Sequence, residues 1–248
     1  MEGIQKKIAV LNDLSGYGRC SLTAAMPVIS ALKVQCCPVV TAVLSNHAGY
    51  PECYMDDYTD RMEAYLEPWR KMGFEMDGIM TGFLGSARQV SIVADFIRDF
   101  KRENTQVLVD PTMGDHGHLY SVCDEDLIEA MRELMQYADV VTPNLTEACA
   151  LTDTLYQENG WSKRKLSDLT WKLHLLGARK VLGRASLMHL PRTGQPKDGR
   201  TAWRNFQRST ARRSKRPAGW RIQAAMQLDL SLLFIRWWRR GSSRRIIR

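Results

Sequence analysis

The 248-residue sequence lacks the features that would mark a membrane, exported or zinc-binding protein. It has no run of 18 apolar residues, so we expect no transmembrane helix. Its start shows no basic segment followed by an apolar stretch, so we expect no signal peptide. The six cysteines form no C-x-x-C pair and no zinc-ligand spacing. Without export they are expected to be reduced thiols, which places the protein in the cytoplasm.

Acidic side chains are scarce in the last part of the chain. Residues 1–181 carry 18 Lys and Arg against 25 Asp and Glu, a net charge of −7. Residues 182–248 carry 17 against 2, a net charge of +15, and they contain no Glu, Tyr or Cys. The two compositions predict two units: a domain over residues 1–181 and a basic, Arg- and Trp-rich tail over residues 182–248.

The first unit alternates short apolar runs with amphipathic helical patterns. We expect strands at residues 7–11, 39–44, 78–81, 107–109 and 140–141, and a further one from residue 179. We expect helices at residues 21–32, 56–72, 87–103, 125–137, 144–151 and 162–176. This alternation predicts an α/β fold, with a mostly parallel sheet and helices on both of its faces.

Ligands of open α/β sheets bind at the carboxyl ends of the strands. The polar or glycine-rich segments that follow the expected strands are residues 12–18, 45–49, 81–83, 110–115 and 142–147. Taken singly, each has an ordinary structural explanation. Asn144 and Glu147 have the spacing of a helix capping box, and Asp110 before Pro111 can simply end a strand.

Taken together and in order, these segments resemble the pyridoxal/pyridoxamine kinase family of the ribokinase-like superfamily. The matching pieces are VLNDLSGYG from Val10, SNH from Ser45, MTG from Met80, DPTMGD from Asp110 and TPNLTE from Thr142. The resemblance covers about residues 6–181, and the last two pieces are the most specific. It implies a ribokinase-like fold and ATP-dependent phosphorylation of the 5′-hydroxymethyl group of pyridoxal, pyridoxamine or pyridoxine.

The resemblance also implies a set of site residues. The implied substrate-binding residues are Ser15, Asn46, His47, Phe83 and Tyr120, and those near ATP, its phosphates and magnesium are Asp110, Asp115, Asn144 and Glu147. Asp110 and Glu147 are the implied Mg²⁺ ligands, consistent with the preference of this ion for oxygen. Ala48 stands where the family often has Thr, which removes a hydroxyl next to the substrate. ATP and Mg²⁺ are the implied cofactors, and a homodimer is the implied assembly.

The resemblance stops near residue 181. It implies a later Gly-Thr-Gly-Asp motif whose Asp is the general base, but residues 182–248 contain no such motif, and their only acids are Asp198 and Asp229. We therefore expect a ribokinase-like domain truncated on its C-terminal side, followed by a poorly ordered tail, with weak or absent kinase activity. No catalytic residue is assigned. A frameshift near codon 181 is the interpretation we favour for the tail.

Other interpretations of the tail and of the function stay open. The tail could bind nucleic acid through residues 212–216, lie on a membrane through residues 228–240, or be a diverged domain. Of these partners we expect neither nucleic acid nor a membrane. The alternative functions are a hydroxymethylpyrimidine kinase, or a non-catalytic relative that binds a small ligand or nucleic acid.

Overall fold

The computed structural model of the chain describes residues 5–183. The expectations for the tail beyond residue 183, including its acids, its basic cluster and its apolar stretch, lie outside the described residues. Between residues 5 and 183, no helix is both long and apolar enough to cross a lipid bilayer.

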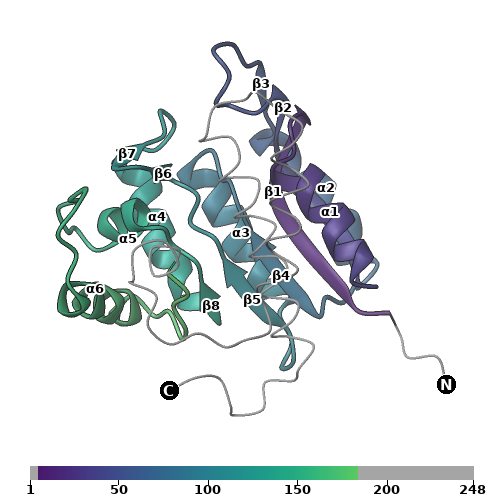
Figure 1. Cartoon of the computed structure of the whole chain (residues 1–248). Helices are drawn as coiled ribbons and strands as arrows, with labels where there is room; N and C mark the ends of the chain where they lie inside the picture. Colours follow the sequence, from purple (N-terminus) through teal and green to yellow (C-terminus); the bar gives the residue numbers. More distant parts are fainter. Residues whose placement is uncertain (1–4, 184–248) are drawn as a thin grey trace.

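A six-stranded sheet forms the centre of the structure, in the order β3-β2-β1-β4-β5-β8 (Figure 1). The strands are β1 (Lys7–Tyr17), β2 (Gln35–Asn46), β3 (Met55–Asp57), β4 (Gly78–Thr81), β5 (Gln106–Val109) and β8 (Val140–Val141). All neighbours are parallel except β3, which runs antiparallel to β2 at one edge. At the other edge Val181 makes a parallel bridge to Val141, where the sequence predicts the start of another strand.

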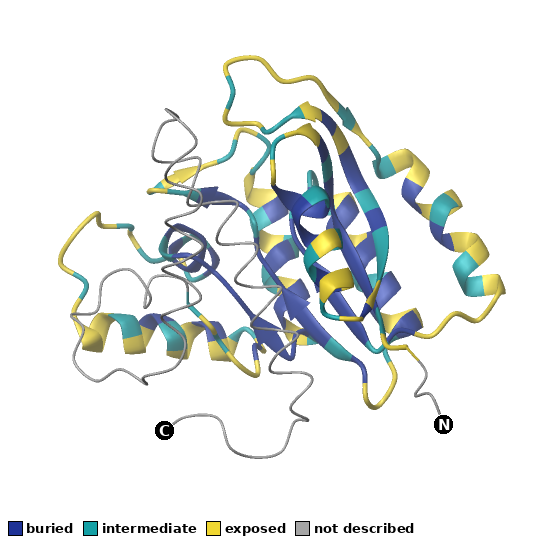
Figure 2. Ribbon diagram, turned by 45° about the vertical axis from the view of Figure 1, so that its right-hand side comes forward, coloured by how far each residue is buried: buried dark blue, intermediate teal, exposed yellow. Residues whose placement is uncertain are grey.

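Helices pack on both faces of the sheet. Helix α1 (Ser21–Ala31) packs on one face, against Ile8, Val10, Met80 and other buried residues. The opposite face is covered by α2 (Thr59–Lys71), α3 (Ala87–Phe100), α4 (Glu125–Leu134), α5 (Leu145–Leu151) and α6 (Lys163–Leu175). Figure 2 shows the resulting pattern, with buried strands in the centre and helices such as α3 that are buried on one side and exposed on the other, whereas α5 is almost wholly buried. The predicted α/β fold, mostly parallel with helices on both faces, is confirmed.

Side-chain caps explain where several helices begin. Ser86 accepts a hydrogen bond from the backbone N–H of Gln89 at the start of α3, and Asp124 accepts one from Leu127 at the start of α4. Such caps satisfy backbone N–H groups that have no partner inside the helix. Both caps are short polar residues that directly precede an amphipathic run, which is why the sequence predicts these two starts correctly.

The expected bounds were wrong in several places. The first strand runs to Tyr17 instead of Leu11, because β2 continues beside it and pairs Ser15 with Leu44 and Tyr17 with Asn46. The helix expected from residue 56 begins at Thr59, because the preceding residues form β3. The helix expected to reach Glu103 ends at Phe100, and the one expected to reach Tyr137 ends at Leu134, followed by a 3-10 turn over Met135–Tyr137.

A short hairpin was not predicted at all. It is formed by β6 (Gly114–Asp115) and β7 (His118–Leu119), which pair antiparallel just after β5. Strands of two residues are too short to show a periodic pattern, so the sequence gives no signal for them.

Replacing Phe96 would show how much one aromatic side chain of the larger core contributes to the free energy of unfolding. Its ring is fully buried, stacks on Phe100 with 4.4 Å between ring centroids, and meets Trp69 edge-on. Phe96→Ala should lower the free energy of unfolding by about 3–5 kcal/mol, because it leaves a cavity that the neighbouring helices cannot fill. Urea unfolding followed by circular dichroism measures this, with the exposed Met72→Ala as the control. A loss below about 1 kcal/mol would contradict the packing described.

Candidate active site

A row of buried polar side chains crosses four neighbouring strands at their carboxyl ends. Asn12 of β1, Thr81 of β4, Asp110 after β5 and Thr142 after β8 are each at most 2% exposed. Buried polar groups are costly unless they are hydrogen-bonded. Their presence together at this edge therefore marks it as the candidate site, in the place where sheets of this kind bind ligands.

Asp110 joins the last three strands of this row. Its backbone N–H donates to Thr81 Oγ1 at 3.3 Å, and Thr142 Oγ1 donates to its carboxyl Oδ1 at 3.2 Å. The residue is 1% exposed. Asp110 is therefore held between neighbours on both sides, which fixes the direction of its carboxyl group.

Asn12 joins β1 to the loop after β4. Its Oδ1 accepts hydrogen bonds from the backbone N–H of Asp13 and of Phe83, each at 2.9 Å. The pairing of β1 with β2 shifts register between Asn12 and Leu14. Gly82 lies against this amide, and a Cβ at that position would come within 2.4 Å of it. The close approach of Asn12 therefore requires a glycine at residue 82.

Asn144 and Glu147 form a complete capping box at the start of α5. The Asn144 N–H donates to Glu147 Oε2 at 2.7 Å, and the Glu147 N–H donates to Asn144 Oδ1 at 2.9 Å. Asn144 Nδ2 also donates to the carbonyl of Gly114 at 2.7 Å, which ties hairpin β6–β7 to α5. Both residues are buried, Glu147 at 1% exposure. The structural explanation of this motif is thus correct, and any role toward a ligand comes in addition to it.

Asp115 differs from the two buried acids in its exposure to solvent. Its Oδ1 accepts a hydrogen bond from the N–H of His116 at 2.8 Å, and its side chain is 36% exposed on hairpin β6–β7. Across residues 5–183 no group of three His, Cys, Asp or Glu side chains is arranged to hold a metal ion. Asp110, Asp115 and Glu147 are therefore not gathered into one carboxylate cage.

Thr112 has an unsatisfied hydroxyl next to Asp110. Its Oγ1 is shielded from solvent, and within the described part of the chain it has no hydrogen-bond partner. Such a group costs about 1–3 kcal/mol. A magnesium–nucleotide complex fits this loop, because Mg²⁺ is usually held by one or two carboxylates together with phosphates and waters rather than by a protein cage. Asp110 supplies a fixed carboxyl, and Thr112 an unused donor.

A second polar cluster lies farther along β1. Ser15 Oγ donates to Asp13 Oδ2 at 2.9 Å, and both residues are at most 5% exposed. Burial raises the pKa of the Asp13 carboxyl, while hydrogen bonds from Ser21 and Ser15 and the nearby His47 oppose the rise. Ser21 has a φ of 51°, an uncommon value for a residue other than glycine. A buried carboxyl and a strained backbone position thus occur together at the candidate substrate end.

Asn46 is the last residue of β2, and His47 follows it. Asn46 Oδ1 accepts from Ser45 Oγ at 2.5 Å and its Nδ2 donates to the carbonyl of Glu52 at 2.8 Å. His47 Nδ1 accepts from the N–H of Gly49 at 2.9 Å. These bonds connect the two implied substrate residues to the loop after β2.

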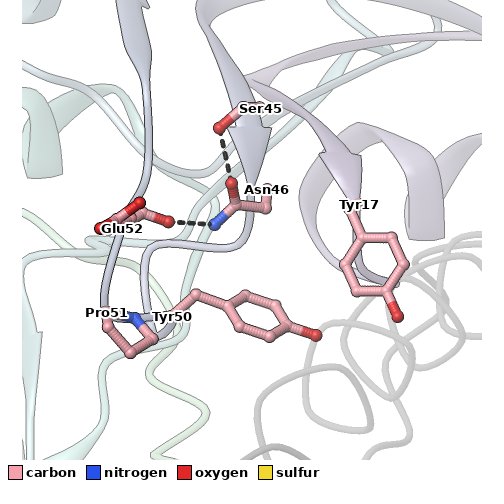
Figure 3. Close-up of a pocket in the computed structure, with 6 residues that line it drawn as sticks. All are labelled: Tyr17, Ser45, Asn46, Tyr50, Pro51 and Glu52. Carbon is pink, nitrogen blue, oxygen red and sulfur yellow. Dashed lines mark hydrogen bonds between the residues drawn. The ribbon is translucent and has the colours of Figure 1, made fainter.

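A pocket of about 420 Å³ opens beside Asn46. It is lined by Tyr17, Ser45, Asn46, Tyr50, Pro51 and Glu52 (Figure 3). The side chain of Tyr50 extends toward Tyr17 in this view, and the two ring centroids are 5.7 Å apart. The pocket combines aromatic faces with a few polar groups, as small-molecule sites do.

Phe83 and Tyr120 are held by their backbones. The Phe83 carbonyl accepts from Thr41 Oγ1 at 2.8 Å, and the Tyr120 N–H donates to the carbonyl of Met113 at 2.9 Å. Both side chains are partly exposed. The structure therefore places every implied site residue at or beyond the carboxyl edge of the sheet, with Ser15, Asn46 and His47 on the extended ends of β1 and β2.

The sequence analysis did not single out several polar residues of this edge. Asn12, Asp13, Thr81 and Thr142 lie inside the segments that were weighed, but none was named as a site residue. Their signal was available, because each is a polar residue directly following an apolar run. The contacts of Tyr17 with Tyr50 had no such signal.

Comparison with known proteins decides the family. A family model described as phosphomethylpyrimidine kinase matches residues 16–214, a stretch that runs past residue 181 into the basic segment. The chain belongs to this family. A pyridoxine/pyridoxal/pyridoxamine kinase of Bordetella avium is 34% identical over 142 residues, which are 55% of this chain and 48% of that protein. This kinase family includes pyridoxal kinases, so the resemblance stated from the motifs is confirmed.

Solved structures of the family show the same fold. One is a Bacteroides thetaiotaomicron protein described as a phosphomethylpyrimidine kinase and crystallised with pyridoxal. It is 42% identical with a TM-score of 0.70, and the match covers 73% of this chain and 63% of that one. Pyridoxal kinase of Leishmania donovani, in complex with ADP and pyridoxamine, is 25% identical with a TM-score of 0.66, over 71% of this chain and 63% of that one. This chain spans less than half the length of the curated pyridoxal kinases it matches.

The contribution of Asp13 to the stability of the fold should depend on pH. Because burial raises its pKa, the folded chain binds this proton more tightly than the unfolded chain does. The stability that Asp13 contributes is therefore complete below about pH 3.9, the pKa of an unfolded Asp. It is lost as the pH rises through the higher pKa of the folded state.

Urea unfolding of the wild type and of Asp13→Asn between pH 3.5 and pH 8 tests this sign. The difference in unfolding free energy, wild type minus variant, should fall as the pH rises. Asp168→Asn, at an exposed position on α6, is the matched control. A difference for Asp13→Asn that grows with pH would show that the fold stabilises the ionised carboxylate instead.

Proposed function

We propose that the chain binds a magnesium–ATP complex and a small ring with a hydroxymethyl group, and that its site is built to phosphorylate that hydroxyl. Pyridoxal, pyridoxamine or pyridoxine is the substrate class we put first. The proposal is supported by family membership and by the pyridoxal, pyridoxamine and ADP found with related proteins.

The observation that carries the proposal is the division of the polar edge into two parts. Asp110, Thr112 and the capping box of α5 lie after β5 and β8, toward the β8 side of the sheet. Asp13, Ser15 and Asn46 lie on the parts of β1 and β2 that extend beyond β4. Two ligands can thus be held side by side at one edge, which a transfer between them requires.

Phosphoryl transfer depends on positioning and on neutralising charge. When bound, Mg²⁺ would supply positive charge to the phosphates, and Asp110 is the carboxyl placed to hold it, with Asp115 and the Asn144–Glu147 pair nearby as implied phosphate residues. Ser15, Asn46, His47, Phe83 and Tyr120 would hold and orient the ring. No residue of the described chain is assigned as general base, so we expect slow or absent turnover.

A hydroxymethylpyrimidine is the alternative substrate, favoured by the name of the matching family model. The two rings differ in their polar groups, so binding distinguishes them directly. Titration calorimetry of the full chain with MgADP, with pyridoxal and with 4-amino-5-hydroxymethyl-2-methylpyrimidine is the test. We expect binding of MgADP and stronger binding of pyridoxal than of the pyrimidine. Absence of MgADP binding would contradict the proposal, and the reverse ring preference would favour the alternative.

Asp110→Asn tests the nucleotide part. The variant keeps an oxygen that can accept from Thr142, so the fold should be retained, but the charge is lost. We expect about a tenfold or greater loss in MgADP affinity, equal to about 1.4 kcal/mol, with pyridoxal affinity unchanged. Glu125→Gln, at an exposed position in the first turn of α4, is the control. Equal loss of both ligands would point to a folding defect instead.

Two substitutions of Glu147 distinguish its capping role from a role in ligand binding. Glu147→Gln keeps an oxygen for the Asn144 N–H, whereas Glu147→Ala leaves that N–H unpaired and should lower the unfolding free energy by about 1–3 kcal/mol. If Glu147 also acts toward magnesium, Glu147→Gln should unfold like the wild type. Its affinity for MgADP should nevertheless fall by more than its affinity for ADP without magnesium. Unfolding and titration of both variants check this. Unchanged MgADP binding by Glu147→Gln would leave Glu147 with its capping role only.

A further inference from the structure

Thr112 Oγ1 is the one buried side-chain polar atom within residues 5–183 that has no hydrogen-bond partner. A buried hydroxyl normally has a partner, and an exception calls for an explanation such as a missing ligand. The neighbouring threonines show the contrast, because Thr41 donates to the carbonyl of Phe83 and Thr142 donates to Asp110. Thr112 Oγ1 has no such contact.

The loop around Thr112 is fixed on both sides, so the hydroxyl cannot relax easily toward a protein partner. The Thr112 N–H donates to the carbonyl of Asp110 at 2.9 Å, which closes a turn around Pro111. Met113 is 1% exposed and belongs to the larger core. Its carbonyl accepts from Tyr120, and the Gly114 carbonyl accepts from Asn144. Among the described residues, the hydroxyl of Thr112 thus has no partner two residues from the buried Asp110.

We propose that Thr112 is a ligand-binding residue whose hydroxyl hydrogen-bonds to an oxygen of the bound magnesium–nucleotide complex. The inference rests on the proposed function, which places the nucleotide at residues 110–115. It adds a residue that the motif resemblance did not assign. The Thr112 hydroxyl then lowers the stability of the protein without ligand and gains a hydrogen bond when the nucleotide complex binds. Removing this hydroxyl should therefore raise the stability of the protein without ligand and lower its affinity for the complex.

Thr112→Val tests this opposition, because valine has the shape of threonine without the hydroxyl. We expect the melting temperature of the protein without ligand to rise by about 2 °C or more. We expect the affinity for MgADP to fall about five- to tenfold, with pyridoxal affinity unchanged. Thr112→Ser keeps the hydroxyl and should retain most of the MgADP affinity.

Thr105→Val is the matched control. Thr105 is 3% exposed and its hydroxyl is fully engaged, since it donates to the carbonyl of Met76 at 2.7 Å and accepts from the N–H of Arg102 at 3.0 Å. It precedes β5, at the opposite end of that strand from Asp110. Its variant should lower the melting temperature and leave MgADP affinity unchanged.

The outcomes separate this inference from the proposed function. Wild type that binds no MgADP would overturn both. Wild type that binds MgADP, with Thr112→Val binding equally well, would overturn the inference alone. A lower melting temperature for Thr112→Val, as for Thr105→Val, would show that the hydroxyl has a partner in the empty protein. Loss of pyridoxal binding in place of MgADP binding would also overturn it, by assigning the hydroxyl to the other ligand.

Discussion

The buried carboxyl of Asp110 is the constraint around which the candidate site is arranged. A carboxylate at 1% exposure is stable only where hydrogen bonds replace water. Thr142 supplies one such bond, and the Asp110 backbone is held in turn by Thr81. Because β4, β5 and β8 are adjacent and parallel, these three residues end their strands side by side. The register of the sheet therefore sets the position of the charge, and the loop that carries Thr112 starts from it.

The same edge of the sheet buries further polar groups that do not stabilise the fold. Asp13 is a second buried carboxyl, with its pKa raised by burial, and Ser21 beside it has a strained backbone angle. Thr112 adds a hydroxyl that has no partner in the part of the chain that the structure describes. Groups of this kind lower stability, and they are typical of places where a fold keeps chemistry available for a ligand. These groups gather at the carboxyl ends of the strands, whereas the aromatic cluster around Phe96 is well packed. The candidate binding edge is thus distinct from the part of the core that supports it.

Much of the framework was predictable from local patterns. Apolar runs such as Ile79–Met80 predicted the strands, amphipathic patterns predicted the helices, and the order of the motifs indicated the family. The extension of β1 was not predictable, because Asn12 and Asp13 are polar and resemble a strand end. They remain in the strand because β2 pairs with residues 14–17 and because Asn12 bonds to Phe83, 71 residues away. The unsatisfied Thr112 hydroxyl is likewise a product of tertiary packing.

The central claim is that one sheet edge holds two ligands at separate groups of residues. Hydrogen exchange of backbone amides, measured by mass spectrometry on the full chain with MgADP, with pyridoxal and with both, tests it most directly. The account predicts that MgADP slows exchange in residues 110–120 and 142–147. It predicts that pyridoxal slows exchange in residues 12–18 and 45–50. Protection of the same segments by both ligands, or of neither region, would contradict the account.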